Sequence, residues 1–447
     1  MVTIKLTLIM KIKLLSLLSI AISAISYGQT YTTQNSGIPV QSFGAREYSI
    51  VDPTTAWITY FDGAGTQTYP KYVGVTTNGG TNWKANLVSN LPSNALISDV
   101  GAINGTTAFI VTAPASGSGT ANGLWKTTNG GANWAKVSGV FSNGSFGNIV
   151  HFFDANNGLV IGDPLNGKYE MYKTTDGGNT WTTLSTAPSP LTNEEYGYVA
   201  GRVFLGEDLW LTSSTGRILH TKDRGMTWDS YFSPVDDFSG ESSSANMSFS
   251  SSTYGLLVDN TGLLWYTEDG GENWDLKTAS NYYDGDLSYI PGSDGVFIST
   301  GFSTESSLGT GSSYTNDNGA TWTKIDEDIQ RLFIGAYDCE SIWVGHYTSD
   351  TSGTGGVLKL NGIPGCSLST NEQTVSKVEL KAVVNGGVLN MISNKEIKSV
   401  LVGDLTGTRL AEVNAKNVNI SALKAGVYFA RVAYTDGSYG TVKFIVK

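Results

Sequence analysis

Six copies of one nine-residue motif constrain the fold of this chain more than any other feature. Each copy has Thr, then Asp or Asn two positions on, Gly two positions later and Trp after three more, as in "KTTDGGNTW" at residues 173–181. The motifs end at Trp83, Trp134, Trp181, Trp228, Trp274 and Trp322, which are 51, 47, 47, 46 and 48 residues apart. A period of this length that holds only short strands is typical of the four-stranded blades of a β-propeller.

The residue types of the motif suit a tight turn between the third and fourth strands of a blade. Asp or Asn can accept hydrogen bonds from N–H groups of its own turn, Gly supplies a positive φ, and Thr can hydrogen-bond across the hairpin. The Trp ring then packs between neighbouring blades. We therefore interpret six motif positions as structural: Asn78, Asn129, Asp176, Asp223, Asp269 and Asp317.

The motif resembles the Asp-box, or BNR, repeat of sialidase-like, sortilin-like and photosystem-assembly-factor-like propellers. Thr174, Asp176, Gly178 and Trp181 match that pattern in full, whereas the first two copies have Asn where the family usually has Asp. The resemblance implies that the motifs are structural and lie away from the ligand-binding face.

A seventh period follows Trp322 without a motif. Residues 329–338, 339–347 and 355–362 read as its first three strands, and residues 30–37 resemble a fourth strand. We therefore expect an all-β fold, with a seven-bladed propeller over residues 29–366 that the N-terminal strand closes, followed by a small β-sandwich. Six blades with an edge hairpin is the alternative.

The N-terminus has the layout of a secretory signal peptide. Three lysines at positions 5, 11 and 13 precede an apolar run that ends in small residues, so we expect cleavage after Gly28. A membrane anchor is the weaker reading, because the apolar run is shorter than the roughly 20 residues that a bilayer requires. Met10 is an alternative start.

Charge and cysteine content limit the possible partners. The chain has 28 Lys and Arg against 39 Asp and Glu, a net charge of −11 that becomes −14 without the three lysines of residues 1–28. This acidity argues against nucleic acid and anionic lipid. In an exported chain, Cys339 and Cys366 are expected to form a disulfide, with two buried thiols as the alternative. His151, His220 and His346 fall in different blades, so we expect no metal or other cofactor, and we expect a monomer.

Residues 378–447, after a linker at 367–377, read as short alternating strands of a β-sandwich. The stretches 400–410, 420–432 and 442–447 closely resemble the type A sorting domain of the Bacteroidetes type IX secretion system, although the usual Pro-Asn-Pro near its start is missing. The resemblance implies export by the type IX machinery and a secreted or outer-membrane cell-surface location.

Acidic and aromatic residues occur together on the face where propellers bind ligands, which carries the links between blades and the loops between second and third strands. Such residues suit sugars, because rings stack on pyranose faces and two carboxyl groups can act as acid and base. The candidate catalytic residues are Glu194, Glu195, Asp284 and Asp286. The candidate ligand-binding residues are Tyr196, Tyr282, Tyr283, Asp236, Asp237, Arg46 and Arg202. Solvated loops without a ligand, or a cation site at Asp284 and Asp286, are the alternatives.

The sequence favours binding over catalysis. A sialidase would need three arginines on the substrate carboxylate, and the propeller offers few outside its motifs: Arg46, Arg202, Arg217 and Arg331. Xyloglucanase-like enzymes pair two propellers, whereas this chain has one. We therefore expect a secreted binding or adhesion module for an extracellular glycan or a surface protein, with a glycoside hydrolase as the alternative.

Overall fold

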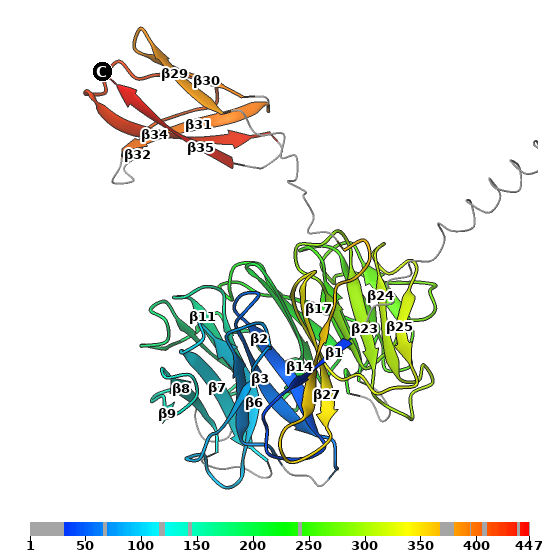
Figure 1. Cartoon of the computed structure of the whole chain (residues 1–447). Helices are drawn as coiled ribbons and strands as arrows, with labels where there is room; N and C mark the ends of the chain where they lie inside the picture. The colour runs from blue at the N-terminus through cyan, green and yellow to red at the C-terminus, as the bar shows by residue number, and fades with distance from the viewer. Residues whose placement is uncertain are drawn as a thin grey trace, which may run out of the picture. The chain divides into compact units, whose positions relative to one another are not determined.

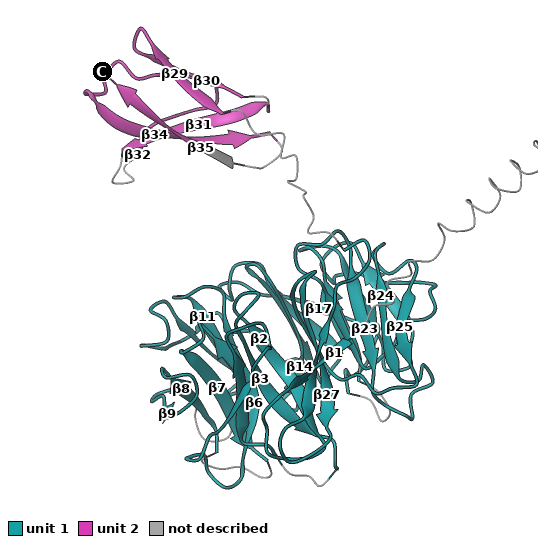
Figure 2. Ribbon diagram, viewed as in Figure 1, with its two compact units in different colours: residues 1–368 teal, residues 369–447 magenta. Residues whose placement is uncertain are grey.

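The computed structural model describes residues 31–446, apart from 66–68, 116–120, 142–144, 240–243, 367–379, 394, 405–408 and 436–438. The expected signal peptide and the whole of the expected linker lie outside these residues. The chain divides into two compact units at Leu368 and Ser369 (Figure 2). No helix within the described ranges is long and apolar enough to cross a membrane.

The first unit is a β-propeller of seven four-stranded antiparallel sheets. Six are built from consecutive strands, with the first strand of each innermost. Blades 1 to 3 consist of β2 (Phe43–Ile50), β3 (Ala56–Asp62), β4 (Tyr72–Thr76) and β5 (Lys84–Leu87); β6 (Ala95–Ala102), β7 (Ala108–Pro114), β8 (Gly123–Thr127) and β9 (Ala135–Lys136); and β10 (Gly147–Phe152), β11 (Gly158–Leu165), β12 (Lys168–Thr174) and β13 (Thr182–Thr183). Blades 4 to 6 consist of β14 (Gly197–Leu205), β15 (Asp208–Ser213), β16 (Arg217–Thr221) and β17 (Asp229–Phe232); β18 (Asn246–Phe249), β19 (Gly255–Val258), β20 (Leu264–Thr267) and β21 (Asp275–Leu276); and β22 (Asp286–Tyr289), β23 (Phe297–Gly301), β24 (Gly311–Thr315) and β25 (Thr323–Glu327).

The seventh sheet joins the two ends of the propeller. It consists of β26 (Ile334–Asp338), β27 (Ser341–Thr348), β28 (Gly355–Leu360) and the N-terminal strand β1 (Tyr31–Asn35), which pairs with β28 (Figure 1). Each inner strand contacts the inner strands of the sheets on either side, and β2 contacts both β6 and β26. The sheets therefore form a closed ring, which leaves few free strand edges.

The repeated motif forms the same turn in each blade that contains it. In blade 3, Asp176 Oδ1 accepts hydrogen bonds from Thr174 Oγ1 at 2.8 Å and Thr180 N at 2.9 Å, while Thr174 Oγ1 accepts one from Gly178 N at 2.9 Å. Gly178 has a φ of 71°, and a Cβ there would lie 2.3 Å from Phe109 of blade 2. The Trp181 ring meets Phe109 edge-on at 5.9 Å. The motif thus orders its own hairpin and packs it against the preceding blade.

A disulfide between Cys339, in the turn from β26 to β27, and Cys366, which follows β28, ties the end of the propeller to its last sheet. The chain between the two cysteines contains both β27 and β28. The bond therefore closes a loop around the sheet that also receives β1.

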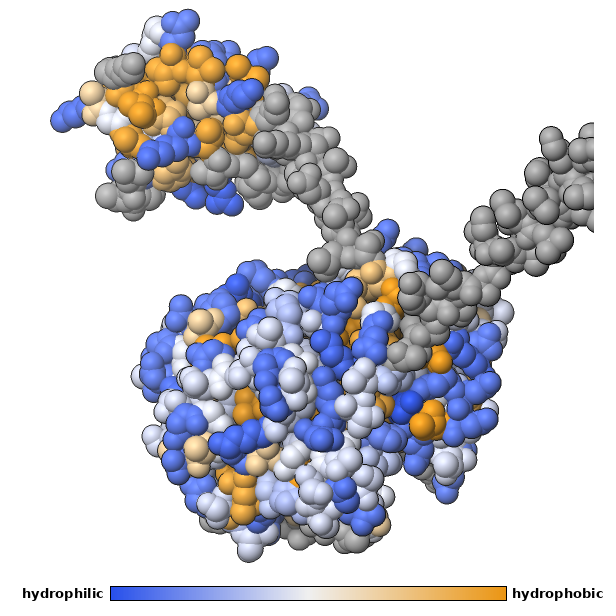
Figure 3. All heavy atoms as spheres, in the orientation of Figure 1, coloured by the Kyte–Doolittle hydropathy of each residue, from blue (hydrophilic) through white to orange (hydrophobic). Residues whose placement is uncertain are grey.

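The second unit is a β-sandwich of a three-stranded and a four-stranded sheet. Its strands are β29 (Lys381–Asn385), β30 (Val388–Ile392) and β33 (Asn417–Asn419) in one sheet, and β32 (Arg409–Val413), β31 (Ile397–Asp404), β34 (Gly426–Tyr434) and β35 (Tyr439–Val446) in the other. Leu389, Val400, Val432 and Phe444 belong to a core of its own. Figure 3 shows hydrophobic residues gathered on the visible face of this unit, while the visible face of the propeller is mostly hydrophilic.

Candidate functional site

The seven inner strands surround a central channel of about 310 Å³. We call the end of the propeller where the inner strands begin the upper face. Charged side chains of β2, β14 and β22 line the channel, and the fully buried Asp99 of β6 pairs with one of them.

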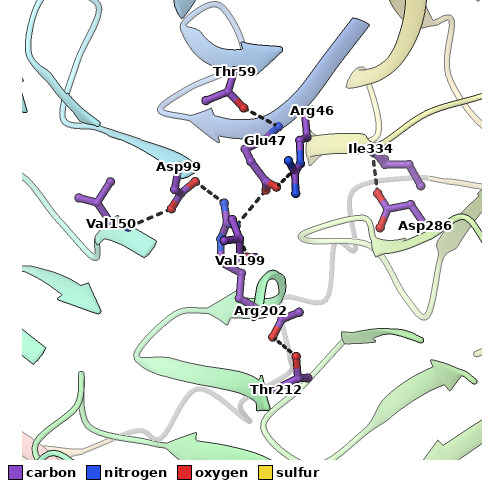
Figure 4. A network of polar contacts seen from close by, with 11 residues as sticks. Arg46, Glu47, Thr59, Asp99, Val150, Val199, Arg202, Thr212, Asp286 and Ile334 are labelled. Atoms are coloured by element: carbon purple, nitrogen blue, oxygen red, sulfur yellow. Dashed lines mark hydrogen bonds and ion pairs between the residues drawn. The ribbon is translucent and has the colours of Figure 1, made fainter. Parts of the chain in front are cut away.

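A buried arginine bridges three blades across this channel (Figure 4). Arg202 of β14 places Nη1 2.9 Å from Glu47 Oε2 of β2 and Nη2 2.5 Å from Asp99 Oδ1 of β6. Nη1 also donates a hydrogen bond to Val199 O at 2.6 Å. Because Arg202 and both carboxylates are largely buried, the removal of one partner would leave another charge unpaired away from water.

Burial shifts three titratable groups at the channel towards their neutral forms. Burial raises the pKa of Asp99 to about 7 despite its ion pair with Arg202, and burial raises the pKa of Asp286 to about 7. Asp286 accepts hydrogen bonds from Ile334 N at 2.8 Å and Leu287 N at 2.9 Å. Burial and the nearby Arg202 lower the pKa of His151 to about 3, and its ring stacks on Phe204 at 3.6 Å. His151 is therefore neutral at physiological pH.

A second cavity, of about 420 Å³, adjoins the channel at the upper face between blades 3, 4 and 5. We call it the side cavity. Arg46 and Asn246 line both the channel and this cavity. Its other lining residues are Phe146, Asn148, Asp163, Tyr196, Gly197, Tyr198, Val199, Gly201, Thr212, Phe238, Ser244 and Ala245.

A β-bulge in β14 shapes the wall of the side cavity. Gly197 pairs with Ser213, but the next pair is Arg202 with Leu211, so residues 198–201 lie opposite Thr212 alone. Gly201 fits because a Cβ there would lie 1.7 Å from Thr212 Oγ1, which donates a hydrogen bond to Gly201 O at 2.9 Å. Extra residues in one strand redirect side chains at sites such as this one.

Asp163 is the one carboxylic acid among the described residues that line the side cavity. Its Oδ1 accepts hydrogen bonds from Asn148 Nδ2 at 2.8 Å and Gly197 N at 3.0 Å. Burial outweighs these two bonds and raises the pKa of Asp163 to about 6.

Two tyrosines and an arginine complete the polar wall. Tyr196 is 45% exposed, and its ring centroid lies 5.4 Å from that of Tyr198. The Tyr198 hydroxyl donates a hydrogen bond to Asp237 Oδ1 at 2.5 Å. Arg46 is half-buried, with its Nε 3.3 Å from Glu47 Oε1.

The structure departs from the expectation that the acidic candidates form an open surface. Glu195 is buried, paired with Arg217 Nη1 at 2.9 Å, and accepts hydrogen bonds from the Tyr169 hydroxyl and Leu191 N. Hydrogen bonds, including one from Ser213, together with Arg217, outweigh burial and lower the pKa of Glu195. Glu195 therefore holds the link between blades 3 and 4 in place.

Candidates between blades 5 and 6 are likewise buried. The Tyr282 and Tyr283 hydroxyls donate hydrogen bonds to Gly262 O at 2.9 Å and Asp326 O at 3.1 Å. Asp284 accepts from Ser306 Oγ at 2.7 Å and 2.9 Å. Because apolar rings fill the interior and short polar side chains cap loops, sequence alone did not separate these roles from ligand binding.

The remaining candidates divide into three groups. Glu194 and Asp236 are exposed and do not line either cavity. Tyr196 and Arg46 line the side cavity, and Asp237 supports it through Tyr198. Arg202 and Asp286 lie in the channel (Figure 4).

Sequence reasoning missed Asp163, Asn148, Tyr198, Glu47 and Asp99. A signal was present for the acids, since Glu47 and Asp99 are the carboxylates of the inner strands "FGAREYSI" and "ALISDVGA". A charge at an inner-strand position needs a partner across the channel. Asp163 lies in the stretch "VIGDP" at residues 160–164, whose bulge was not visible in the sequence.

Fold and site together define a β-propeller whose central channel is bridged by an arginine and whose upper face carries a side cavity. No family model matches the chain. Over 128 residues it is 29% identical to the photosystem II assembly lipoprotein Ycf48 of Synechococcus sp. (strain CC9902), a match that covers 29% of this chain and 35% of the relative. The chain thus matches about a third of the length of that curated relative.

Two solved structures are also similar. YCF48 from Cyanidioschyzon merolae is 14% identical, with a TM-score of 0.50 that covers 74% of this chain and 99% of that one. A structure of YCF48 bound to D1 peptide is 15% identical, with a TM-score of 0.49 that covers 76% and 97%. The first of these similarities shows a shared propeller fold.

Proposed function

We propose that this chain is a secreted or cell-surface binding module that holds an extracellular glycan in the side cavity. The observation that carries the proposal is the side cavity itself, in which the exposed Tyr196 stands beside hydrogen-bonding groups of Tyr198, Asp163 and Asn148. A cavity of about 420 Å³ falls in the range of small-ligand sites.

The chemistry of the cavity wall supports a sugar ligand. An exposed aromatic ring offers a flat apolar surface of the kind that stacks on a pyranose face. Asp163 and Asn148 offer acceptors and donors for hydroxyl groups, with Oδ2 of Asp163 free of hydrogen bonds from the described residues. Residues 198–201 add backbone groups that the bulge leaves outside the β14–β15 ladder.

The arrangement favours binding over cleavage. Hydrolysis of a glycoside commonly requires two carboxyl groups that flank the scissile bond. Three of the four candidate acids, Glu195, Asp284 and Asp286, accept hydrogen bonds from their own protein, and the fourth, Glu194, lies outside both cavities. Asp163 faces the side cavity, and no second acid lines it among the described residues.

Delivery to the cell surface is the second half of the proposal. The expected signal peptide at residues 1–28 would direct the chain across the inner membrane, and residues 378–447 would engage the type IX secretion machinery. A sandwich with its own core supports a separable role for that unit.

Retention on a panel of immobilised polysaccharides, recorded together with release of reducing ends, tests the proposal on residues 29–447. We expect retention without release, and at least tenfold weaker retention for Tyr196→Ala. Tyr69→Ala is the matched control, because Tyr69 is also 45% exposed but lines neither cavity. Retention by no glycan would contradict the proposal, and release that Asp163→Asn abolishes would replace it with the hydrolase.

A further inference from the structure

Arg46 has two partners among the described residues: the Glu47 carboxylate and the Phe333 ring, whose centroid lies 6.0 Å from the guanidinium carbon. Arg46 lies in a bulge of β2, where the register shifts between Ala45 and Tyr48, and its side chain is 36% exposed. Its contact with Glu47 is 3.3 Å long, and Arg46 Nε forms no hydrogen bond with any described residue. The carboxylate of Glu47 is already shared with Arg202 at 2.9 Å.

The fixed position of Arg202 explains why Arg46 remains available. Arg202 uses Nη1 and Nη2 on Glu47, Asp99 and Val199 O, and its side chain is only 9% exposed. Arg46 instead contacts Oε1, the other carboxylate oxygen of Glu47 (Figure 4). Its side chain lines both the channel and the side cavity. A guanidinium group in such a position can form two parallel hydrogen bonds with a carboxylate.

We propose that the ligand of the side cavity is an acidic glycan, with the carboxylate of a uronic acid residue paired with Arg46 and its ring on Tyr196. This inference rests on the proposed function and narrows the ligand class. The chain has a net charge of −11, and Arg46 is the one lysine or arginine among the described residues that line the side cavity. A ligand with one carboxylate and several hydroxyls matches one guanidinium, one carboxyl and two amide groups.

The size of the cavity agrees with this ligand. The cavity of about 420 Å³ has room for one to two hexose-sized residues, on the order of 150 to 200 Å³ each when close-packed. Phe238 and Phe146 give the wall apolar patches on which the less polar ring faces can lie.

Calorimetric titration of residues 29–447 with galacturonotriose, and with the same trisaccharide after reduction of its carboxyl groups, tests the inference. We expect the acidic form to bind at least tenfold more tightly, and Arg46→Gln to remove that difference. Arg46→Lys is expected to keep part of it, because Lys retains the charge but not the bidentate geometry. Arg224→Gln, at an arginine whose side chain is 34% exposed and lines neither cavity, is expected to bind like the parent.

Other outcomes separate the two proposals. Equal affinity for the acidic and the reduced trisaccharide would overturn the acidic ligand and leave glycan binding intact. Failure to bind either form, with retention on no polysaccharide, would overturn both. Binding of a poly-glutamate peptide but of no sugar would assign the carboxylate to a protein partner and overturn both as well. The two-ligand comparison uses the unmodified chain, so it decides the question even where Arg46→Gln does not fold.

Discussion

At the residue scale, three charged side chains form ion pairs between blades at the channel. Arg202 joins blades 4, 1 and 2 through Glu47 and Asp99, and all three side chains are largely buried. A buried ion pair contributes little net stability, but a broken one costs much, because the charge that remains has lost both its partner and its water.

Arg202→Met should therefore be strongly destabilising. We expect the free energy of unfolding to fall by about 3 to 5 kcal/mol, since Glu47 and Asp99 lose their shared cation. Urea denaturation followed by tryptophan fluorescence measures the change. Arg224→Met, which removes more exposed ion pairs with Asp154 and Glu207, should cost less than about 1 kcal/mol. Equal losses for the two variants would disprove the bridging role.

Because the pKa of Asp163 is raised, we expect the stability of the folded protein to depend on pH. Its pKa is about 6 in the folded protein and about 3.9 in an unfolded chain, so between these values the folded state binds the proton more tightly. The contribution of Asp163 to stability is therefore present below pH 4 and is lost as pH rises through 6.

Asp163→Asn removes this titration and keeps an Oδ1 acceptor for Asn148 and Gly197. We expect the stability of the parent, relative to that of the variant, to decline from pH 4.5 to 6.5 in urea denaturation at several pH values. If the stability of the parent minus that of Asp163→Asn stays constant or grows over that pH range, Asp163 is not buried as described.

At the element scale, the side chains of the repeated motif stabilise one hairpin turn through several hydrogen bonds. In blade 6, Asp317 Oδ1 accepts hydrogen bonds from Thr315 Oγ1 and Thr321 N, and Oδ2 accepts one from Thr321 Oγ1. Asn78 forms the first two kinds of bond in blade 1 but has an amide nitrogen in place of the second oxygen.

Asp317→Ala is expected to lower the free energy of unfolding by about 2 kcal/mol, since three acceptor contacts are lost at once. Asp317→Asn should cost less than half as much, because the natural motifs at Asn78 and Asn129 tolerate that residue. Thermal unfolding of the parent and both variants measures the two losses of stability and hence their ratio. A larger loss for Asn than for Ala would contradict this role of the motif.

The elements were predictable where a local pattern decides them. The motif spacing predicted the propeller, and the strands of blade 3 lie where "GNIVHFF" and "YEMYKTT" placed them. The bulges at residues 198–201 and 46–47 were not predictable, because a bulge depends on the register between two strands rather than on the sequence of one. The side cavity, which these bulges shape, was not predicted for the same reason. Tyr196 and Arg46, which line it, were nevertheless among the candidate ligand-binding residues.

At the whole-molecule scale, the two units each have a core, which suits a binding module delivered by a separate sorting domain. Removal of residues 369–447 is expected to leave glycan retention by the propeller within about twofold, because all described residues that line the side cavity lie between Arg46 and Asn246. The same truncation should abolish appearance at the cell surface of a host with a type IX system, measured by surface labelling. Undiminished surface display of the truncated chain would contradict the proposed export route.

A crystal structure of residues 29–447 with galacturonotriose shows directly whether the side cavity is the ligand site. We expect electron density for a sugar ring on Tyr196, with its carboxylate within hydrogen-bonding distance of Arg46. Density for the trisaccharide at any other surface, with the side cavity empty, would rule out the side cavity as the ligand site.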